Sequence, residues 1–327
     1  MRCLLTNSND VFFNSAVEEY FMKEFNEPIF MLWKNTPNVM VGRNQNTVSE
    51  VNQKFCKENN IAIIRRLSGG GAIYNSLENF EYTLIINKLD NANYSFKSIV
   101  EPLIDFLKQI GIDAQFTGRN DVLVDGKKIS GNAQYHFKDI LLQHGTVLYD
   151  VDINTLMKCL TPDLMKLTAK GIKSVKSRVT TLKERLPDNY NVDKFMDEFM
   201  KFNLNLSNEN YYKELTEDEK VEVLKLKKDR WDKKEWNFGK NPKYSNKKKR
   251  KFTSGLVEIN YEIKAGKIFN VKIYGDFFAV SDISELEDKL LDNYFEKEII
   301  VELLKDIKIS NYIDGITNNE FVELLFE

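Results

Sequence analysis

Three consecutive glycines, Gly69, Gly70 and Gly71, follow the cation of Arg66 and the hydroxyl of Ser68 in the segment RRLSGGGA. Glycine costs backbone entropy on folding, so a run of three indicates that the chain needs special backbone angles or space there. Without Cβ atoms, successive N–H groups can approach an anion closely. The segment therefore predicts an anion-binding loop, although a plain glycine-rich turn would fit the same residues. It is not a Walker loop, because no Gly-Lys-Ser/Thr follows.

A second segment, GRNDVLVDGKKISG, could carry the cation that such an anion needs. Asp125 and Gly126 predict a two-residue type I′ turn between two strands. A turn of that length fixes the register of the strands. The expected pairs are Val124 with Lys127, Leu123 with Lys128, Val122 with Ile129, and Asp121 with Ser130.

Alternation along the two strands separates polar from apolar side chains. The apolar residues of the hairpin are expected on one face, and Asp121, Lys128 and Ser130 on the other. Lys128, rather than Lys127 at the tip, is therefore the candidate catalytic residue. A solvated hairpin with ordinary surface lysines is the alternative.

A third segment places His144, Gly145 and Thr146 inside an apolar strand. A glycine in a strand often marks a place where a ligand or another backbone approaches closely. The histidine could bind a ligand, but a hydrogen-bonded core histidine fits equally well. This segment alone does not decide between the two.

The apolar periodicity predicts the elements that must position these segments. Asp10 can cap a first helix, and Gly111 can close a helix that Ser95 opens. Helices are predicted at residues 10–25, 47–59 and 95–110, and strands at 29–33, 39–41, 61–64, 82–87, 112–117, 121–124, 127–130, 132–137 and 140–147. So many strands joined by short turns predict an α+β fold with a mixed, largely antiparallel sheet.

The composition changes at residues 240–251, where polar residues and lysines replace the apolar pattern. We interpret this stretch as a linker. Strands at residues 255–263 and 267–274, and helices near 284–294 and 296–306, would form a small α/β domain after it. The chain is thus expected to divide into a catalytic domain, residues 1–245, and an accessory domain, residues 246–327.

The composition also excludes several classes of function. The 327 residues carry a net charge of −2, which gives no general attraction to nucleic acid or anionic membranes. Three scattered cysteines and two histidines offer no zinc-ligand set. The amino terminus lacks the apolar core of a signal peptide, and no apolar run has the length of a membrane span. We therefore expect a cytoplasmic protein, in which the basic run at residues 247–251 is solvated.

In their order along the chain, these segments resemble the lipoate–protein ligase A family. The matching segments are GRNQ (42–45), RRLSGGGAIYN (65–75) with Glu78 and Asn79, GRNDVLVDGKKISGNAQY (118–135), HGT (144–146), KGIKSVKSRV (170–179) and WNFGKNP (236–242). They span nearly the whole chain, and their combination is far more specific than any one of them. The resemblance implies a catalytic domain related to biotin ligases and class II aminoacyl-tRNA synthetases, followed by a small accessory domain.

The resemblance also assigns candidate site residues. Lys128 is similar to the lysine that contacts the reacting carboxylate and α-phosphate, and Asp121 to a residue beside the nucleotide phosphates and metal ion. The residues implied to bind lipoate or nucleotide are Arg66, Ser68, Gly69, Gly70, Gly71, Ala72, Asn75, Asn79, Asn120, Asp121, His144, Gly145 and Thr146. Those implied to form a loop over the adenylate are Lys170, Gly171, Lys173, Ser174 and Arg178. Asn75 and Glu78 replace a histidine and a glycine that many members have, which bears on contacts to the lipoyl group.

The activity implied by the resemblance has two steps. Lipoate, or octanoate, would react with ATP in the presence of Mg²⁺, giving lipoyl-AMP and pyrophosphate. The lipoyl group would then pass to a lysine of an acceptor protein, either a dehydrogenase E2 lipoyl domain or the glycine-cleavage H protein. We expect a monomer with no nucleic-acid or membrane partner.

Three other interpretations stay open. A lipoyl or octanoyl transferase of the same fold would carry the acyl group on a cysteine without ATP, and Cys159 would be its candidate. A biotin ligase would share the fold, but paired arginines before SGGGA and the extended GRND…KxSG region are the lipoate-type arrangement. A non-catalytic binding module would keep the fold, yet such a module is expected to lose Arg66 and Lys128.

Overall fold

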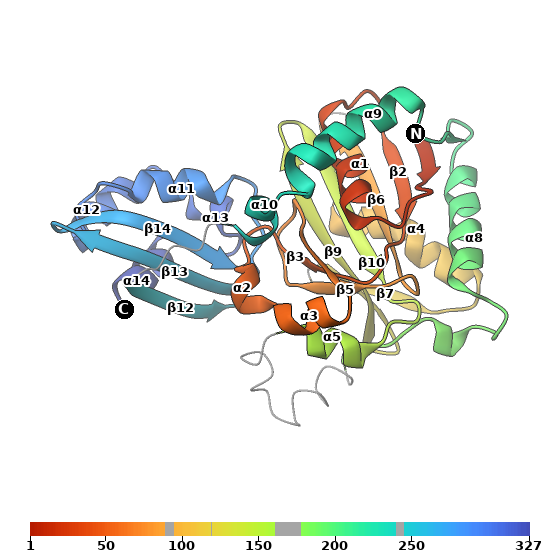
Figure 1. Cartoon of the computed structure of the whole chain (residues 1–327), viewed down its shortest axis with the longest axis horizontal. Coiled ribbons are helices and arrows are strands. Elements are labelled where there is room, and N and C mark those ends of the chain that lie inside the picture. Colours follow the sequence, from red (N-terminus) through yellow and green to blue (C-terminus); the bar gives the residue numbers. More distant parts are fainter. Residues whose placement is uncertain (89–94, 119, 161–177, 240–244) are drawn as a thin grey trace. The chain divides into compact units, whose positions relative to one another are not determined.

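The computed structural model describes residues 1–88, 95–118, 120–160, 178–239 and 245–327. The chain forms two compact units (Figure 1). Unit 1 comprises Met1–Met40, Val48–Ile64 and Ile73–Asn237, and unit 2 comprises Val41–Thr47, Arg65–Ala72 and Phe238–Glu327. The glycine loop therefore belongs to the unit that the carboxy-terminal residues build. The division into a catalytic domain, residues 1–245, and an accessory domain, residues 246–327, stays a prediction.

Unit 1 is built on a mixed sheet of eight strands in the order β11-β1-β2-β6-β10-β9-β8-β7. β1 pairs in parallel with β2 and β11, and the other pairs are antiparallel. The strands are β1 Arg2–Leu5, β2 Ile29–Trp33, β6 Phe80–Asn87, β7 Ala114–Thr117, β8 Asp121–Val124, β9 Lys127–Phe137, β10 Ile140–Val147 and β11 Tyr211–Tyr212. The predicted mixed, largely antiparallel sheet is confirmed.

A smaller sheet holds the two ends of the glycine loop. Its strands are β3 (Asn38–Val41), β4 (Ala62–Arg65) and β5 (Ile73–Asn75), in the order β4-β3-β5. β4 leads into the loop, and β5, which pairs antiparallel with β3, continues the chain after it. The loop thus spans from one side of β3 to the other.

Helices α4 (Phe96–Gln109) and α8 (Val192–Asn205) supply an aromatic core to unit 1. Their side chains Phe106, Phe195 and Phe199 are fully buried in one cluster with residues of the large sheet. Phe106 packs edge to face on Phe195, with ring centroids 5.1 Å apart. Burying a ring of this size stabilises a fold by about 1.5–3 kcal/mol. The prediction of α4 from its apolar stripe is confirmed, whereas α8 was not predicted.

Helix α1 (Val11–Lys23) covers the opposite face of the sheet. Its start is capped as predicted, because the Asp10 side chain accepts a hydrogen bond from a backbone N–H of the first turn. Glu18 of α1 accepts a hydrogen bond from Thr83 of β6, whereas the preceding Tyr82 lies in the aromatic core. Since neighbouring strand residues point to opposite faces, α1 and α4 enclose the sheet between them.

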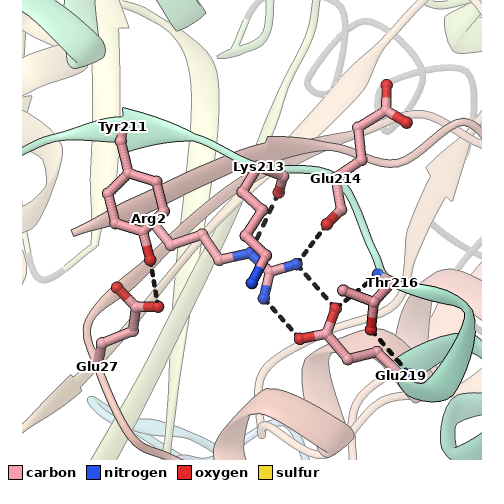
Figure 2. Close-up of polar contacts among 7 residues, drawn as sticks. All are labelled: Arg2, Glu27, Tyr211, Lys213, Glu214, Thr216 and Glu219. Atoms are coloured by element: carbon pink, nitrogen blue, oxygen red, sulfur yellow. Dashed lines mark hydrogen bonds and ion pairs between the residues drawn. The ribbon is translucent and has the colours of Figure 1, made fainter.

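Arg2 of β1 holds the chain that follows the two-residue edge strand β11 (Figure 2). Its guanidinium donates to both carboxylate oxygens of Glu219, at 2.6 and 2.9 Å, and to the Glu214 carbonyl oxygen at 2.6 Å. The Arg2 side chain is only 4% exposed, so water screens this ion pair weakly. These contacts fix the start of helix α9 (Glu217–Leu226) beside the sheet.

The remaining short elements are α2 Thr47–Glu50, α3 Gln53–Glu58, α5 Ile153–Cys159, η1 Lys183–Arg185, η2 Lys227–Trp231 and α10 Lys234–Phe238. The prediction of one helix over residues 47–59 is wrong. Val51 forms a β-bridge with Leu160, and the Asn52 side chain accepts a hydrogen bond from the Phe55 N–H, which starts a new helix. The strands predicted at residues 127–130 and 132–137 also prove to be one continuous strand, β9.

Unit 2 has its own antiparallel sheet and its own core. The strands are β12 Asn246–Phe252, β13 Gly255–Lys264 and β14 Lys267–Gly275, in that order. The helices are α11 Ile283–Leu290, α12 Lys297–Leu304, α13 Ile309–Tyr312 and α14 Asn318–Phe326. The two predicted strands and two predicted helices are present, although the first helix ends at Leu290 rather than near residue 294. Helices α13 and α14 were not predicted. Throughout the described ranges of both units, no helix has the length and apolar content needed to cross a membrane.

The interpretation of residues 240–251 as a linker is wrong for the basic run. Residues 247–251 lie in β12, an edge strand of the second sheet. Lys247 and Lys249 extend to the buried carboxylate of Glu258 on β13, at 2.8 and 3.9 Å. Because a buried carboxylate needs cationic partners, lysines can belong to a folded strand here. Residues 240–244 lie outside the described part of the chain.

Candidate active site

The hairpin that carries Lys128, formed by β8 and β9, begins as predicted. Asp125 and Gly126 have φ angles of +50° and +72°, as a type I′ turn requires. The two residue pairs nearest the turn are those expected. Lys127 is exposed, whereas Lys128 is half-buried.

Beyond these pairs the predicted register is wrong, because a β-bulge adds one residue to β9. Val122 pairs with Ser130 instead of Ile129. Asp121 pairs with Gly131 instead of Ser130. The bulge leaves Ile129 and Ser130 both fully buried, so Ser130 does not share the polar face of the hairpin.

The polar face of the hairpin holds an ion pair. The Lys128 ammonium lies 2.7 Å from a carboxylate oxygen of Asp121, and the two side chains are 35% and 36% exposed. A Cβ on Gly131 would lie 2.5 Å from Lys128 Nζ, so glycine is needed to leave room for the ammonium. An ammonium has three N–H donors, and its contact with Asp121 uses one. The hairpin thus presents a fixed cation that could bind an anionic group.

Asn120, just before the ion pair, is bound to Asn132, just beyond it. The Asn120 side chain donates to the Asn132 carbonyl oxygen at 2.6 Å. Asn132 donates in return to the Asn120 carbonyl oxygen from its backbone N–H and its side chain, at 3.0 and 3.1 Å. The Asn132 side chain also accepts a hydrogen bond from Tyr82, whose pKa is raised by burial. Sequence reasoning missed Asn132, although it directly follows the KKISG motif.

Asp121 could hold a metal ion only together with substrate groups. Among the residues that the structure describes, no three His, Cys, Asp or Glu side chains are grouped so that they could hold a metal. Mg²⁺ is usually bound by one or two carboxylates, waters and substrate phosphates rather than by a cage of protein ligands. A single, partly exposed carboxylate such as Asp121 fits that type of site.

In unit 2, the glycine loop folds around the side chain of Arg66. The Arg66 guanidinium donates to the carbonyl oxygens of Gly69 and Gly71, at 2.7 and 2.8 Å. It also donates to the Ser68 hydroxyl at 3.1 Å. Arg66 and Ser68 are both buried. Arg66 therefore fixes the shape of the loop, whatever contact it makes with an anion.

Three of the glycines in unit 2 allow close backbone packing. A Cβ on Gly69 would overlap the carbonyl oxygen of Phe277, and a Cβ on Gly42 would overlap that of Gly70. Gly70 also has a φ angle of +90°, which other residues rarely adopt. Gly71 is different, because it is exposed and a Cβ there would meet no atom within 4 Å. Of these four glycines, only Gly71, at the accessible end of the loop, could carry a side chain without a clash.

Arg65 binds the first segment of unit 2 to the loop. Its guanidinium donates to the carbonyl oxygens of Gly42, Arg43 and Gln45, at 3.0, 2.7 and 2.7 Å. Burial lowers the pKa of Arg65 to about 10, which leaves the group charged at neutral pH. Arg43 in turn forms an ion pair of 2.5 Å with Asp282, at the start of α11.

His144 belongs to a buried hydrogen-bonded network on the α1 side of the large sheet. Its Nδ1 lies 2.9 Å from Glu18 Oε1, to which the Thr83 hydroxyl also donates at 2.6 Å. The Trp33 indole donates to that hydroxyl at 2.9 Å. All four side chains are buried. A hydrogen-bonded core histidine, one of the two interpretations above, is therefore present, and a role in ligand binding stays a prediction.

The Cβ position of Gly145 lies on the face of β10 opposite to His144, and neighbouring side chains fill the space there. A Cβ on Gly145 would overlap the Asn132 side chain and lie 2.8 Å from the Tyr82 ring. Thr146, the next residue, is 7% exposed. The absence of a side chain at Gly145 thus leaves room for the side chains of Asn132 and Tyr82.

Asn75, which replaces a histidine of the family pattern, and Asn79, which follows the other departure at Glu78, are both buried. The Asn75 amide donates to the Glu81 carboxylate at 2.6 Å and the Asn79 amide donates to Asn75 at 3.3 Å. Asn79 also accepts a hydrogen bond from the Ser76 N–H at 3.1 Å. Glu78, in contrast, is exposed. The asparagine that replaces a histidine is therefore held in a buried amide–carboxylate network.

The sequence matches two family descriptions. Residues 10–202 match the lipoyl protein ligase A/B catalytic domain, and residues 241–325 match the carboxy-terminal region of bacterial lipoate protein ligases. The chain belongs to the lipoate–protein ligase family. The resemblance that the motifs indicated is thereby confirmed.

Ligases of this family align with almost the entire chain. Lipoate-protein ligase LplJ of Bacillus subtilis is 37% identical over 325 residues, which cover 98% of either chain. Lipoate–protein ligase 1 of Staphylococcus aureus is 36% identical over 321 residues, again 98% of either chain. The crystal structure of P. falciparum LipL1 with lipoate has a TM-score of 0.77 and 28% identity, over 99% of this chain and 97% of that one. The predicted enzyme class and α+β fold are confirmed.

All three cysteines of the ligase are buried, which bears on the transferase interpretation. Cys3, Cys56 and Cys159 are each 0% exposed. The hydrogen bond that the Cys159 thiol donates to Cys56 raises the pKa of Cys159, as does burial, and burial raises the pKa of Cys3 to about 11. Accepting that bond lowers the pKa of Cys56, but its thiol is fully buried. An acyl-carrying cysteine must be accessible and ionised. The geometry of the ligase thus gives no support to acyl transfer through a cysteine.

Part of the predicted adenylate loop lies outside the described residues, namely Lys170, Gly171, Lys173 and Ser174. Arg178 is described and is exposed. The residue after it, Val179, forms a parallel β-bridge with Lys128. The chain that leaves the predicted loop therefore runs directly beside the candidate catalytic lysine of the ligase.

Proposed function

We propose that the ligase activates lipoate with ATP, forming lipoyl-AMP and pyrophosphate, and then transfers the lipoyl group to a lysine of an acceptor protein. The observation that carries this proposal is the fixed cation of the hairpin, where Lys128 lies over Gly131 and beside Asp121. Membership of a lipoate ligase family supports lipoate as the acid. Octanoate has the same reacting group and is a second candidate acid.

Activation by ATP is needed because a free carboxylate does not acylate an amine. A carboxylate oxygen of lipoate attacks the α-phosphorus of ATP, the bond to the β-phosphate oxygen breaks, and pyrophosphate leaves. Negative charge develops on the α-phosphate oxygens, and the Lys128 ammonium would stabilise it. Asp121 would hold the ammonium in place. One preorganised donor of this kind contributes about 3–4 kcal/mol, or roughly 100- to 1000-fold in rate.

Other residues would support the same chemistry. Mg²⁺, when bound, neutralises the charge of the phosphates. The carboxylate of Asp121 would hold this metal ion. In unit 2, we propose that backbone N–H groups of the glycine loop, at the exposed Gly71 and the half-buried Ala72, bind an anion. We also propose that the nearby Asn120 and the buried His144 contribute to the binding of nucleotide and lipoate.

Transfer requires no nucleophile from the enzyme. The amine of the acceptor lysine attacks the acyl carbonyl, the acyl–phosphate bond breaks, AMP leaves, and the amine loses its proton. The burial of all three cysteines is consistent with this route. We propose an E2 lipoyl domain or a glycine-cleavage H protein as the acceptor, and a monomeric enzyme that acts in the cytoplasm.

The proposal is tested by incubating the enzyme with ATP, Mg²⁺ and lipoate, then measuring lipoyl-AMP and pyrophosphate. We expect both products with the native enzyme. Lys128→Ala should reduce their rate of formation by roughly 100-fold or more. The variant should still fold, because a partly exposed ion pair contributes only about 0–1 kcal/mol to stability.

Lys127→Ala is the matched control, since it removes the neighbouring, exposed lysine of the same hairpin. Its rate should stay within about twofold of the native rate, because no charge is lost from the polar face. Full activity of Lys128→Ala at saturating ATP and lipoate would defeat the assignment. A native enzyme that releases no pyrophosphate with lipoate would defeat the proposed function itself.

A further inference from the structure

Arg185 connects the turn of the Lys128 hairpin to the segment that pairs with Lys128. Its Nε and Nη2 donate to a carboxylate oxygen of Asp125, in the turn, at 3.1 and 2.8 Å. Its Nη1 donates to the Thr180 hydroxyl and to the Thr181 carbonyl oxygen, both at 3.0 Å. One guanidinium therefore holds two segments that are far apart in the sequence.

The Lys128 hairpin needs such a support because β10 does not extend far enough. β10 pairs with β9 only as far as Val147 and Ser130. Beside Lys128 the neighbouring chain is instead Val179, which forms a parallel β-bridge with it. The Thr180 N–H donates to the Lys128 carbonyl oxygen at 3.0 Å. The segment that Arg185 holds thus replaces β10 as the backbone neighbour of the lysine.

The bulge makes the orientation of Lys128 sensitive to that neighbour. The extra residue of β9, Ile129, directly follows Lys128. A shift of one residue in strand register turns a side chain to the opposite face of the sheet. Pairing with β8 on one side and with Val179 on the other therefore fixes the direction in which the ammonium points.

The contact between Arg185 and Asp125 fixes the position of the hairpin turn but contributes little to the free energy of unfolding. The Asp125 side chain is 74% exposed, and such a pair contributes only about 0–1 kcal/mol. The planar guanidinium, however, directs its donors in fixed directions toward three different groups. A lysine ammonium on a flexible stem would not reproduce that arrangement.

We propose that Arg185 is a positioning residue for Lys128. It does not touch the reactants. It holds the hairpin turn and the Val179–Thr180 backbone together, so that the Lys128 ammonium stays where charge develops in the reaction. The inference rests on the proposed function of Lys128. Displacing a catalytic group by about 1 Å can lower a rate by roughly 100-fold, so loss of Arg185 is expected to reduce kcat.

The test compares the kinetics of lipoyl-AMP formation in full-length variants. Arg185→Ala should lower kcat by about 10- to 100-fold while the KM values for ATP and lipoate stay within about twofold. Arg185→Lys should recover part of the loss, and Asp125→Gly, which keeps the positive φ of the turn, should lower kcat in the same direction. Arg250→Ala is the matched control, because Arg250 also pairs with two carboxylates, Glu323 and Glu327, but in unit 2. Its kcat should equal that of the native enzyme.

Hydrogen exchange provides a direct structural measurement. In Arg185→Ala the Thr180 amide, which donates to Lys128, should exchange faster than in the native enzyme. If Arg185→Ala fails to fold, Asp125→Gly decides the matter, since it removes an exposed partner of the same contact and glycine readily adopts the positive φ of this turn position.

Two results would overturn the inference alone. One is a native kcat in both Arg185→Ala and Asp125→Gly. The other is a rise of both KM values with kcat unchanged, which would indicate a binding role. A native enzyme that forms no lipoyl-AMP would instead overturn the proposed function, and this inference with it.

Discussion

The ammonium of Lys128 occupies the space in which a side chain of Gly131 would begin. A Cβ at position 131 would lie 2.5 Å from Lys128 Nζ and 2.7 Å from its Cε. The β-bulge brings the two residues onto the same face, with Asp121 opposite Gly131. The glycine of the KKISG motif is therefore required by the lysine side chain rather than by an unusual turn of the backbone.

Gly131→Ala is predicted to displace the Lys128 ammonium and to lower the rate of lipoyl-AMP formation by about 100-fold. Stability should change little, because the new methyl group meets the flexible end of a side chain. Rate measurements and thermal unfolding of the same variant check both parts. Gly111→Ala is the control: Gly111 has a φ of +83° and open space around it, so that variant should lose stability and keep its rate. A native rate for Gly131→Ala would show that the position of the ammonium is unimportant.

The hairpin shows how far local sequence determines such a site. The type I′ turn follows from two adjacent residues, Asp125 and Gly126, and the pair that contains Lys128 lies close to it. The choice of Lys128 over Lys127 therefore follows from local chemistry. The bulge one residue later depends on packing Ile129 into the core, and no local pattern predicts it.

The glycine loop and the basic run show the limits of the same reasoning. The three glycines of the loop predict a need for space, but only at Gly69 would a Cβ overlap a backbone, that of Phe277, far along the chain. The network around His144 depends on Glu18 in another element. The run at residues 247–251 has the composition of a linker, and only the buried Glu258 reveals it as a strand. The contacts with Phe277 and Glu18 are long-range, whereas Glu258 lies on the strand that follows the basic run.

Gly69→Ala is predicted to destabilise unit 2, because the new Cβ would overlap the Phe277 carbonyl oxygen. Overpacking of this kind costs about 1–3 kcal/mol. Gly71→Ala, two residues later, should be close to neutral, since nothing lies within 4 Å of its Cβ position. Urea unfolding of the two variants measures the difference. Equal stabilities would mean that the loop does not pack on Phe277 as described.

The buried cysteines predict how the native enzyme responds to a thiol reagent. Iodoacetamide at pH 8 should leave Cys3, Cys56 and Cys159 unmodified in the native state and should alkylate all three after denaturation, because only an accessible thiolate reacts. Cys159→Ala should keep both lipoyl-AMP formation and transfer. Mass analysis during turnover should detect no acyl group on a cysteine. An acylated cysteine would support the transferase mechanism.

Asp282 links the stability of unit 2 to pH. It pairs with Arg43 at 2.5 Å and accepts a hydrogen bond of 3.1 Å from the Ser284 N–H. Burial opposes ionisation of Asp282, but the charge of Arg43 and the bonds from Ser284 outweigh it, so the pKa of Asp282 is lowered from 3.8. A carboxyl group with a lower pKa in the folded state contributes stability above its ordinary value. That contribution declines as the pH falls below 3.8 and is lost below the folded-state pKa.

Asp282→Asn should therefore unfold at a lower temperature than the native enzyme at pH 7, and the difference should shrink below pH 3.8. Thermal unfolding of both proteins between pH 7 and pH 3 measures it. Asp288→Asn, an exposed change on the same helix, controls for the effect of removing one negative charge. If Asp282→Asn and Asp288→Asn shift the unfolding temperature equally at every pH, the ion pair with Arg43 does not stabilise unit 2. A difference confined to Asp282→Asn above pH 3.8 would instead place that pair among the contacts that hold the glycine-loop unit together.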